Sequence, residues 1–230
     1  MPNISGPTQW KKKVIAAVAY PTMLYGAVTW ADGTRHKYYR QMLESLNRRI
    51  AIRVTSAYRT VSTAAVFAIS GVPPIDLRIK EKLLGYTKGK EFRAQARQEI
   101  MDEWQNRWSQ YEGLTKMNIK DIRIWNNRKW DEVNYYLTQA MTGHGVFGKF
   151  LHRIGKRETA ECWYCGKVDD AVHTLFRCQR WEVERSKGPV QIRQDSKSKV
   201  MTDTQEGYKT VTEVISGIMG KKAKEEPRAK

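Results

Sequence analysis

The sequence predicts a mainly α-helical chain: a helical bundle, then a small cysteine-containing element, then a C-terminal helix with a disordered tail. Two observations predict this fold class. Apolar residues recur at intervals of three and four along most of the chain, which is the period of an amphipathic helix. No stretch shows a persuasive strand alternation, and only residues 53–55 are ambiguous. The length of 230 residues allows one large domain or two small ones.

This periodicity, with caps and turn residues, predicts helices at Trp10–Trp30, His36–Val54, Ala64–Ile69, Ile75–Tyr86, 90–111, Trp130–Thr142, Val146–Ile154 and Tyr208–Met219. We expect the first to be mostly buried and bent at Pro21, because a proline removes a backbone hydrogen bond. The second is amphipathic, with arginines on one side. Ser62 or Thr63 caps the third helix, and Gly71 ends it.

An aromatic stripe marks the predicted helix at 90–111. Its members recur every four residues and finally after three: Phe92, Ala96, Ile100, Trp104, Trp108 and Tyr111. Such a stripe forms either part of a core or a platform on which nucleic-acid bases stack. The core interpretation is favoured, because burial is the commoner use of an apolar helix face.

Positive charge is in large excess, with 41 Lys and Arg against 24 Asp and Glu, a net charge of +17. A field of this size attracts polyanions, first nucleic acid and then anionic membranes, although basic proteins without such partners exist. Residues 1–60 carry ten basic residues against two acidic ones. The phosphate contacts predicted there are Lys11, Lys12, Lys13, Arg40, Arg48, Arg49 and Arg53.

All three cysteines lie in one window with a histidine, in the pattern C-x2-C-x7-H-x4-C formed by Cys162, Cys165, His173 and Cys178. These are the donors of a tetrahedral structural zinc site, and Gly166 eases the tight turn that points the first two inward. The sequence therefore predicts a CCHC zinc knuckle with Zn²⁺ as a structural cofactor. Incidental cysteines are the alternative, but they leave unexplained why the rest of the chain has none. His144 and His152 are interpreted as loop or surface histidines rather than ligands.

Two rings, Trp163 and Tyr164, lie between the first two predicted ligands. A turn of this kind can present a ring to an unpaired base, with Lys167, Arg177 and Arg180 close by for phosphate. The rings can equally cover the metal from water. The sequence leaves both uses open.

A reducing compartment is predicted, because thiols in a metal-binding spacing remain free there. The uncharged stretch Val14–Ala31 follows three lysines and superficially resembles a signal anchor. Its alanines, with Pro21 and Gly26, make it a poor membrane span. We therefore expect an intracellular protein, nuclear or cytoplasmic, that does not bind a membrane.

Four segments are expected from charge and pattern: a basic helical region at 1–115, a helical connector at 116–158, the zinc knuckle at 159–185, and a linker, short helix and charged tail at 186–230. The linker at 186–200 is rich in Lys, Ser, Gln and Arg, and the final KKAKEEPRAK is charged. Both are therefore expected to be flexible.

Several stretches, taken in order, resemble a known family. They are 19–27 with Trp30, 46–49, 53–60, 68–77, 142–145, the Cys162–Cys178 segment (the zinc window) with Trp181, and 218–222. This succession resembles the region after the polymerase core in the reverse transcriptases of insect-type non-LTR retrotransposons, including its CCHC zinc knuckle. The likeness covers nearly the whole chain and is more specific than any one motif.

The resemblance implies a C-terminal fragment with a thumb-like region at 1–115, lacking the endonuclease and the polymerase palm of such enzymes. Asp169 and Asp170 do not replace the palm aspartates, because they lie inside the zinc loop without an apolar strand around them. We therefore expect no catalytic residues, no small-molecule substrate, and binding of RNA or DNA. A zinc-dependent protein–protein interaction module is the alternative. The choice among RNA, DNA and hybrid stays open, as does the oligomeric state.

Overall fold

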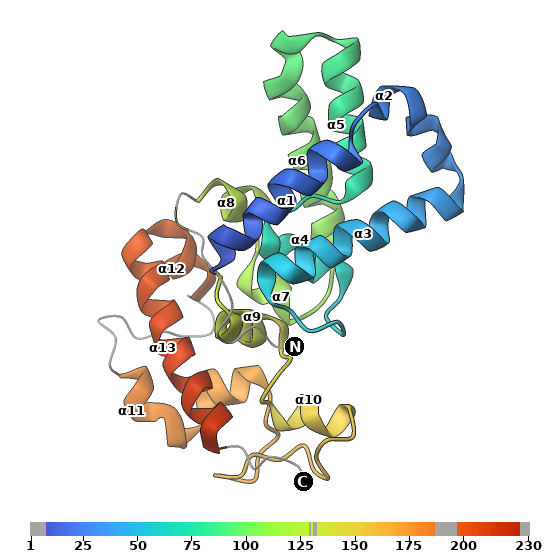
Figure 1. Ribbon diagram of the computed structural model, residues 1–230. Coiled ribbons are helices and arrows are strands. Elements are labelled where there is room, and N and C mark those ends of the chain that lie inside the picture. Colours follow the sequence, from blue (N-terminus) through green and yellow to red (C-terminus); the bar gives the residue numbers. More distant parts are fainter. Residues whose placement is uncertain (1–7, 129, 131–132, 187–196, 226–230) are drawn as a thin grey trace. The chain divides into compact units, whose positions relative to one another are not determined.

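A computed structural model describes residues 8–128, 130, 133–186 and 197–225 (Figure 1). These residues form helices joined by turns, and the strand pairing among them is a single antiparallel bridge between Glu161 and Val168. The predicted mainly α fold class is confirmed.

The chain divides into two compact units. The first is Met1–Glu112 with Asp121–Asn127, and the second is Gly113–Lys120 with Arg128–Lys230. The zinc window and the C-terminal helix therefore share one unit.

The first unit contains the helices α1 (Gln9–Met23), α2 (Ala27–Trp30), α3 (Lys37–Thr55), α4 (Thr63–Ser70), α5 (Ile75–Thr87), α6 (Arg93–Ser109) and α8 (Ile122–Asn127), with short 3-10 turns at Ala31–Arg35 and Lys90–Phe92. Helix α3 packs against α1 and α4, and α5 packs against α6 as a hairpin (Figure 1). Ala16 and Tyr20 of α1 pack with Ile50 and Val54 of α3. The Tyr20 hydroxyl donates a 2.6 Å hydrogen bond to the buried Asn47 Oδ1.

The structure contains the residues predicted to begin and end α4. The Ser62 side chain, rather than that of Thr63, caps α4 by accepting a hydrogen bond from the Ala65 N–H. Gly71 ends α4 at φ 71°, a left-handed conformation that favours glycine.

In the aromatic stripe of α6, the buried members are Ala96, Ile100, Trp104 and Trp108. Those four therefore belong to a core, whereas Phe92 is exposed.

The predicted burial of the first helix is wrong. Val14, Ile15 and Val18 of α1 are 57%, 52% and 66% exposed. Only one face of α1 meets α3, so the low charge of this stretch does not reflect burial on all sides. The helix ends at Met23, two residues after Pro21, and Gly26 precedes α2 at φ 61°.

The second unit contains the helices α7 (Leu114–Asn118), α9 (Tyr135–Thr142), α10 (Gly148–Arg153), α11 (Glu182–Arg185), α12 (Lys197–Asp203) and α13 (Gln205–Glu225). Helix α13 is the centre of this unit, because it packs against α9, α11 and α12. Its buried face includes Val211, Ile215 and Ile218.

Two sequence predictions about the C-terminal segment are corrected here. Helix α13 continues through residues 220–225, which the sequence assigns mainly to a charged, disordered tail. Lys222 is buried in that extension, and its contacts hold the helix end in place. Residues 197–200 of the predicted linker begin α12. The rest of the linker, 187–196, and the rest of the tail, 226–230, lie outside the described residues.

Among the described residues, no single helix has the length and hydropathy needed to cross a bilayer. The pair Lys11–Met23 and Ala27–Arg35 meets that criterion only when taken together, with a 58° bend between its two parts.

A buried lysine gives the second unit an expected pH dependence. Burial lowers the pKa of Lys197 from 10.5 to about 7, and its Nζ lies 5.8 Å from the centre of the Phe176 ring. Because the unfolded chain keeps the ordinary pKa, it binds this proton more tightly than the folded chain between about pH 7 and 10.5. The destabilisation by Lys197 is therefore full below pH 7, and it disappears as the pH rises through that window.

Replacement of this lysine tests the effect. We expect Lys197→Met to raise the free energy of unfolding by about 2 kcal/mol at pH 6 and by much less near pH 10. Urea denaturation at both pH values measures the difference. The exposed neighbour provides the control, because Lys199→Met should change stability little at either pH. An equal gain from Lys197→Met at both pH values would contradict the assignment.

Candidate metal centre

The first two predicted ligands lie on a tight turn closed by backbone hydrogen bonds. The Cys162 N–H donates to the Lys167 carbonyl over 2.7 Å, and the Gly166 N–H donates to the Cys162 carbonyl over 2.9 Å. Gly166 has φ 70°, so the turn needs a residue that tolerates the left-handed region. This local geometry places both Cys162 and Cys165 on the inner side of the turn.

The other two predicted ligands lie at the two ends of a single π-helical turn, His173–Arg177. The Cys178 N–H donates to the His173 carbonyl over 2.8 Å, which closes a loop of five residues. The Asp170 carboxylate accepts a 2.8 Å hydrogen bond from the His173 N–H and so fixes the start of the turn. A spacing of five therefore returns Cys178 to the side of His173.

The four ligand atoms converge on one point. The atoms of Cys162, Cys165, His173 and Cys178 all lie within 4.8 Å of one another. The sulfurs of Cys162 and Cys178 are 3.8 Å apart, and the sulfur of Cys165 is 3.3 Å from Nε2 of His173. A tetrahedral ion with Zn–S bonds of about 2.3 Å requires sulfur–sulfur distances of about 3.8 Å. The donor set and its geometry thus fit a zinc ion.

Protonation also agrees with metal binding. Burial lowers the pKa of His173, so its imidazole is neutral near pH 7 and keeps a lone pair for a metal. Burial raises the pKa of Cys162 to about 11, whereas the hydrogen bond from the Lys167 N–H lowers the pKa of Cys165. The buried thiol is therefore protonated in the metal-free chain, and ion binding would release that proton.

A buried carboxylate beside the cluster joins the zinc window to α10 and α13. Asp169 is fully buried, and its oxygens accept 2.7 Å hydrogen bonds from the Gly148 N–H, the Thr174 hydroxyl and the Lys222 ammonium. A guanidinium nitrogen of Arg157 lies 3.7 Å away. The window is therefore part of the second unit rather than a separate appendage.

The two rings of the zinc turn have different surroundings. Trp163 is 58% exposed, and the guanidinium of Arg157 lies 4.2 Å from its ring centre. Tyr164 packs edge to face on Trp181, and its hydroxyl donates to the Glu225 carboxylate at the end of α13. Trp163 is thus partly exposed beside Arg157, whereas Tyr164 ties the turn to α13.

The predicted basic contacts of the zinc window also differ. Lys167 and Arg177 are exposed. Arg180 forms a 2.7 Å ion pair with Glu225 and lies against the rings of Tyr164 and Trp181. The positive charge of Arg180 is therefore partly neutralised within the second unit.

Two of the predicted phosphate contacts of the first unit take part in hydrogen bonds within that unit. Lys12 is 6% exposed, and its Nζ donates a 2.5 Å hydrogen bond to the Ser56 hydroxyl. Arg48 donates to the carbonyls of Arg59 and Val61 over 2.7 Å and 2.6 Å. The structure leaves Lys11, Arg40, Arg49 and Arg53 exposed and Lys13 half-buried.

The remaining histidines lie outside the cluster. Nδ1 of His144 is 2.9 Å from the Thr142 carbonyl, and Nδ1 of His152 is 3.1 Å from the Arg157 carbonyl. The described part of the chain thus has one group of metal-ligand side chains, the one that the sequence predicts.

The chain is similar to several polyproteins of mobile elements. It is 26% identical over 187 residues to the "Retrovirus-related Pol polyprotein from type-1 retrotransposable element R1 4" of Nasonia vitripennis, which covers 72% of this chain and 47% of the relative. It is 28% identical over 197 residues to the R1 2 counterpart of the same species, which covers 75% and 48%. A Pol polyprotein of element R1 from Bradysia coprophila is 27% identical over 184 residues, covering 70% and 18%.

The chain therefore spans at most about half the length of these three relatives. No protein-family model matches it, and no solved structure matches it significantly. The resemblance predicted from the sequence is confirmed: over about three quarters of its length, the chain is similar to the Pol polyproteins of R1 non-LTR retrotransposons.

Proposed function

We propose that this chain is a nucleic-acid-binding, C-terminal segment of a non-LTR retrotransposon reverse transcriptase that contains a structural zinc knuckle. The convergence of three thiols and an imidazole within 4.8 Å carries the proposal. Four protein ligands leave no open position for water, so the ion would stabilise the fold rather than catalyse a reaction. The segment would have no polymerase activity alone and would act inside the cell, in the nucleus or cytoplasm.

Binding would rest on two kinds of contact. Exposed cations of the first unit, Lys11, Arg40, Arg49 and Arg53, would contact phosphates, which gives affinity without sequence preference. Trp163 offers an exposed ring on which an unpaired base can stack. Lys167 and Arg177 are exposed nearby for further phosphate contacts.

Salt dependence tests the phosphate contacts. We expect the triple variant Arg40→Gln, Arg49→Gln, Arg53→Gln to bind a single-stranded RNA more weakly and to lower the slope of log K against log salt by about 2 units. Fluorescence anisotropy at increasing salt measures both quantities. The matched control removes three exposed charges from the second unit, Lys199→Gln, Lys209→Gln and Lys224→Gln, and should change the slope less.

A protein-interaction module is the second candidate function, and one observation favours it. Val14, Ile15 and Val18 form an exposed apolar face on α1, of the kind that marks protein interfaces. If the chain binds no RNA or DNA at low salt, yet retains a protein partner after nuclease treatment, this second function replaces the first.

A further inference from the structure

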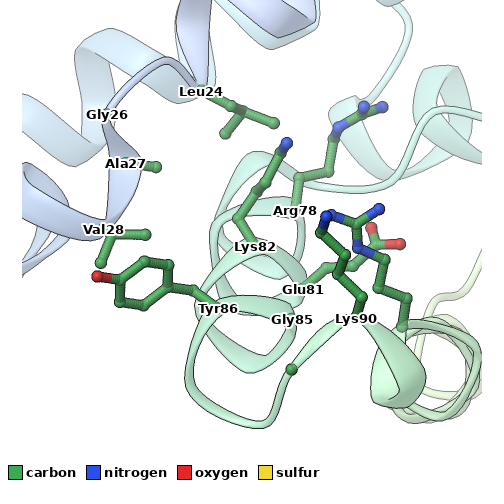
Figure 2. A pocket seen from close by; sticks show the side chains of 12 residues that line it. Leu24, Gly26, Ala27, Val28, Arg78, Glu81, Lys82, Gly85, Tyr86 and Lys90 are labelled. Atoms are coloured by element: carbon green, nitrogen blue, oxygen red, sulfur yellow. The ribbon is translucent and has the colours of Figure 1, made fainter.

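The first unit contains a pocket of about 700 Å³ that the proposed basic contacts do not include (Figure 2). It lies between α2 on one side and the hairpin of α5 and α6 on the other. Its volume is within the range of sites that bind small molecules, about 300–1,000 Å³.

One part of this pocket is strongly cationic. Arg78 and Lys82 contribute from α5, Lys90 from the 3-10 turn Lys90–Phe92, and Arg93 from the start of α6. Gly89 has φ 94°, so it allows the reversal of the chain that brings the second pair back toward the first.

Part of this charge is neutralised, because Glu81 attracts Arg78 and the Glu91 carboxylate lies beside Gly89. The acid in the lining, Glu81, is 3.2 Å from Arg97, which lies outside the pocket. Within the part of the chain that the structure describes, Lys82, Lys90 and Arg93 have no acidic partner. The Arg78 guanidinium lies 3.9 Å from the centre of the Tyr20 ring, and its buried Nε has no hydrogen-bond partner. The pocket therefore favours a multiply charged anion.

The other part of the pocket is apolar and aromatic. Leu24, Ala27 and Val28 line it, and Tyr86 is 71% exposed. Figure 2 shows Tyr86 reaching from α5 toward Val28, while Lys82 points toward Leu24. A pocket lined by a ring on one side and by cations on the other matches a ligand that combines a flat base with phosphate.

We propose that this pocket binds one unpaired nucleotide of a single-stranded nucleic acid. Its phosphates would contact Lys82, Lys90 and Arg93, and its base would stack on Tyr86. A base pair inside a duplex could not enter, because its base faces are already stacked. The inference rests on the proposed function and assigns a single-strand subsite to it.

Fluorescence anisotropy tests this subsite by comparing two labelled RNAs. One is a single-stranded oligouridylate, and the other is a blunt duplex with the same number of phosphates. We expect Tyr86→Ala to weaken single-strand binding about tenfold and to leave duplex binding unchanged, with Tyr86→Trp retaining affinity. The variant Lys82→Gln, Arg93→Gln should act in the same direction. Tyr38→Ala, which removes another exposed ring of the first unit, is the control and should have no effect.

The outcomes separate this inference from the proposed function. If neither Tyr86→Ala nor the double charge variant changes the affinity for either RNA, the subsite is overturned and the proposed function stands. Displacement of the oligonucleotide by micromolar uridine monophosphate would assign the pocket to a free nucleotide and also overturn the subsite. No binding of either RNA at low salt overturns both.

Discussion

Exchange of Asp169 for alanine is expected to lower the free energy of unfolding of the second unit by about 3–5 kcal/mol. The change leaves the ammonium of Lys222, which is 1% exposed, buried without its 2.7 Å counter-ion. It also removes the acceptor of the Gly148 N–H and the Thr174 hydroxyl. Urea denaturation measures the loss, and hydrogen exchange shows whether it is confined to the second unit.

A double-mutant cycle separates the buried charge from the lost hydrogen bonds. In Asp169→Asn combined with Lys222→Met, neither charge of this pair remains, whereas the Arg157 guanidinium beside residue 169 is present in every variant of the cycle. The pair should therefore lose about 1–3 kcal/mol less than the two single variants added together. Glu158→Ala, which removes an exposed acid of the same unit, should change stability by less than about 0.5 kcal/mol. Strictly additive losses would show that Asp169 and Lys222 do not act as a pair.

Removal of zinc is expected to have the second large effect. Structural zinc sites in small peptides contribute about 10–16 kcal/mol of apparent binding free energy, so Cys178→Ser should unfold residues 159–182. Because Lys222 contacts Asp169 inside that window, the last turns of α13 should also open. Helices of the first unit should persist, since the metal ligands all lie in the second.

Hydrogen exchange with and without a chelator measures this effect. His144→Ala is the control, because His144 lies outside the cluster and its loss should leave the metal bound. Unchanged exchange across 159–182 after chelation would count against a structural zinc, and a loss of helix in both units would contradict their independence.

The residues of the candidate metal centre could be predicted from the sequence because their geometry is local. Two residues separate Cys162 from Cys165, and one π-helical turn connects His173 to Cys178. Each pair is thus brought together by backbone hydrogen bonds within a few residues. The ligand spacing does not reveal the contacts around the cluster. Lys222, for example, lies far along the chain and donates a hydrogen bond to Asp169.

Some of the missed burial had a signal in the sequence. Lys222 follows Ile218 by four residues and so continues the buried face of α13, and Lys12 precedes Ala16 and Tyr20 at the same interval on α1. Position on a helix face therefore outweighed charge in both places. Tertiary contacts support this burial: Lys12 bonds to Ser56.

Short helices were missed for a different reason, since each depends on contacts outside itself. The Gln105 side chain accepts a 2.8 Å hydrogen bond from the Ile122 N–H at the start of α8. The Thr115 hydroxyl of α7 donates to the Met141 carbonyl over 3.1 Å. Periodicity over five or six residues cannot reveal such support.

Metal analysis of the purified chain tests the central claim most directly. We expect one zinc ion per chain, and an X-ray absorption spectrum that shows three sulfurs at about 2.3 Å and one nitrogen at about 2.0 Å. The Cys178→Ser variant should lose the ion. Purified protein without zinc, or zinc bound only by oxygen and nitrogen, would contradict the Cys3His site and the fold support assigned to it.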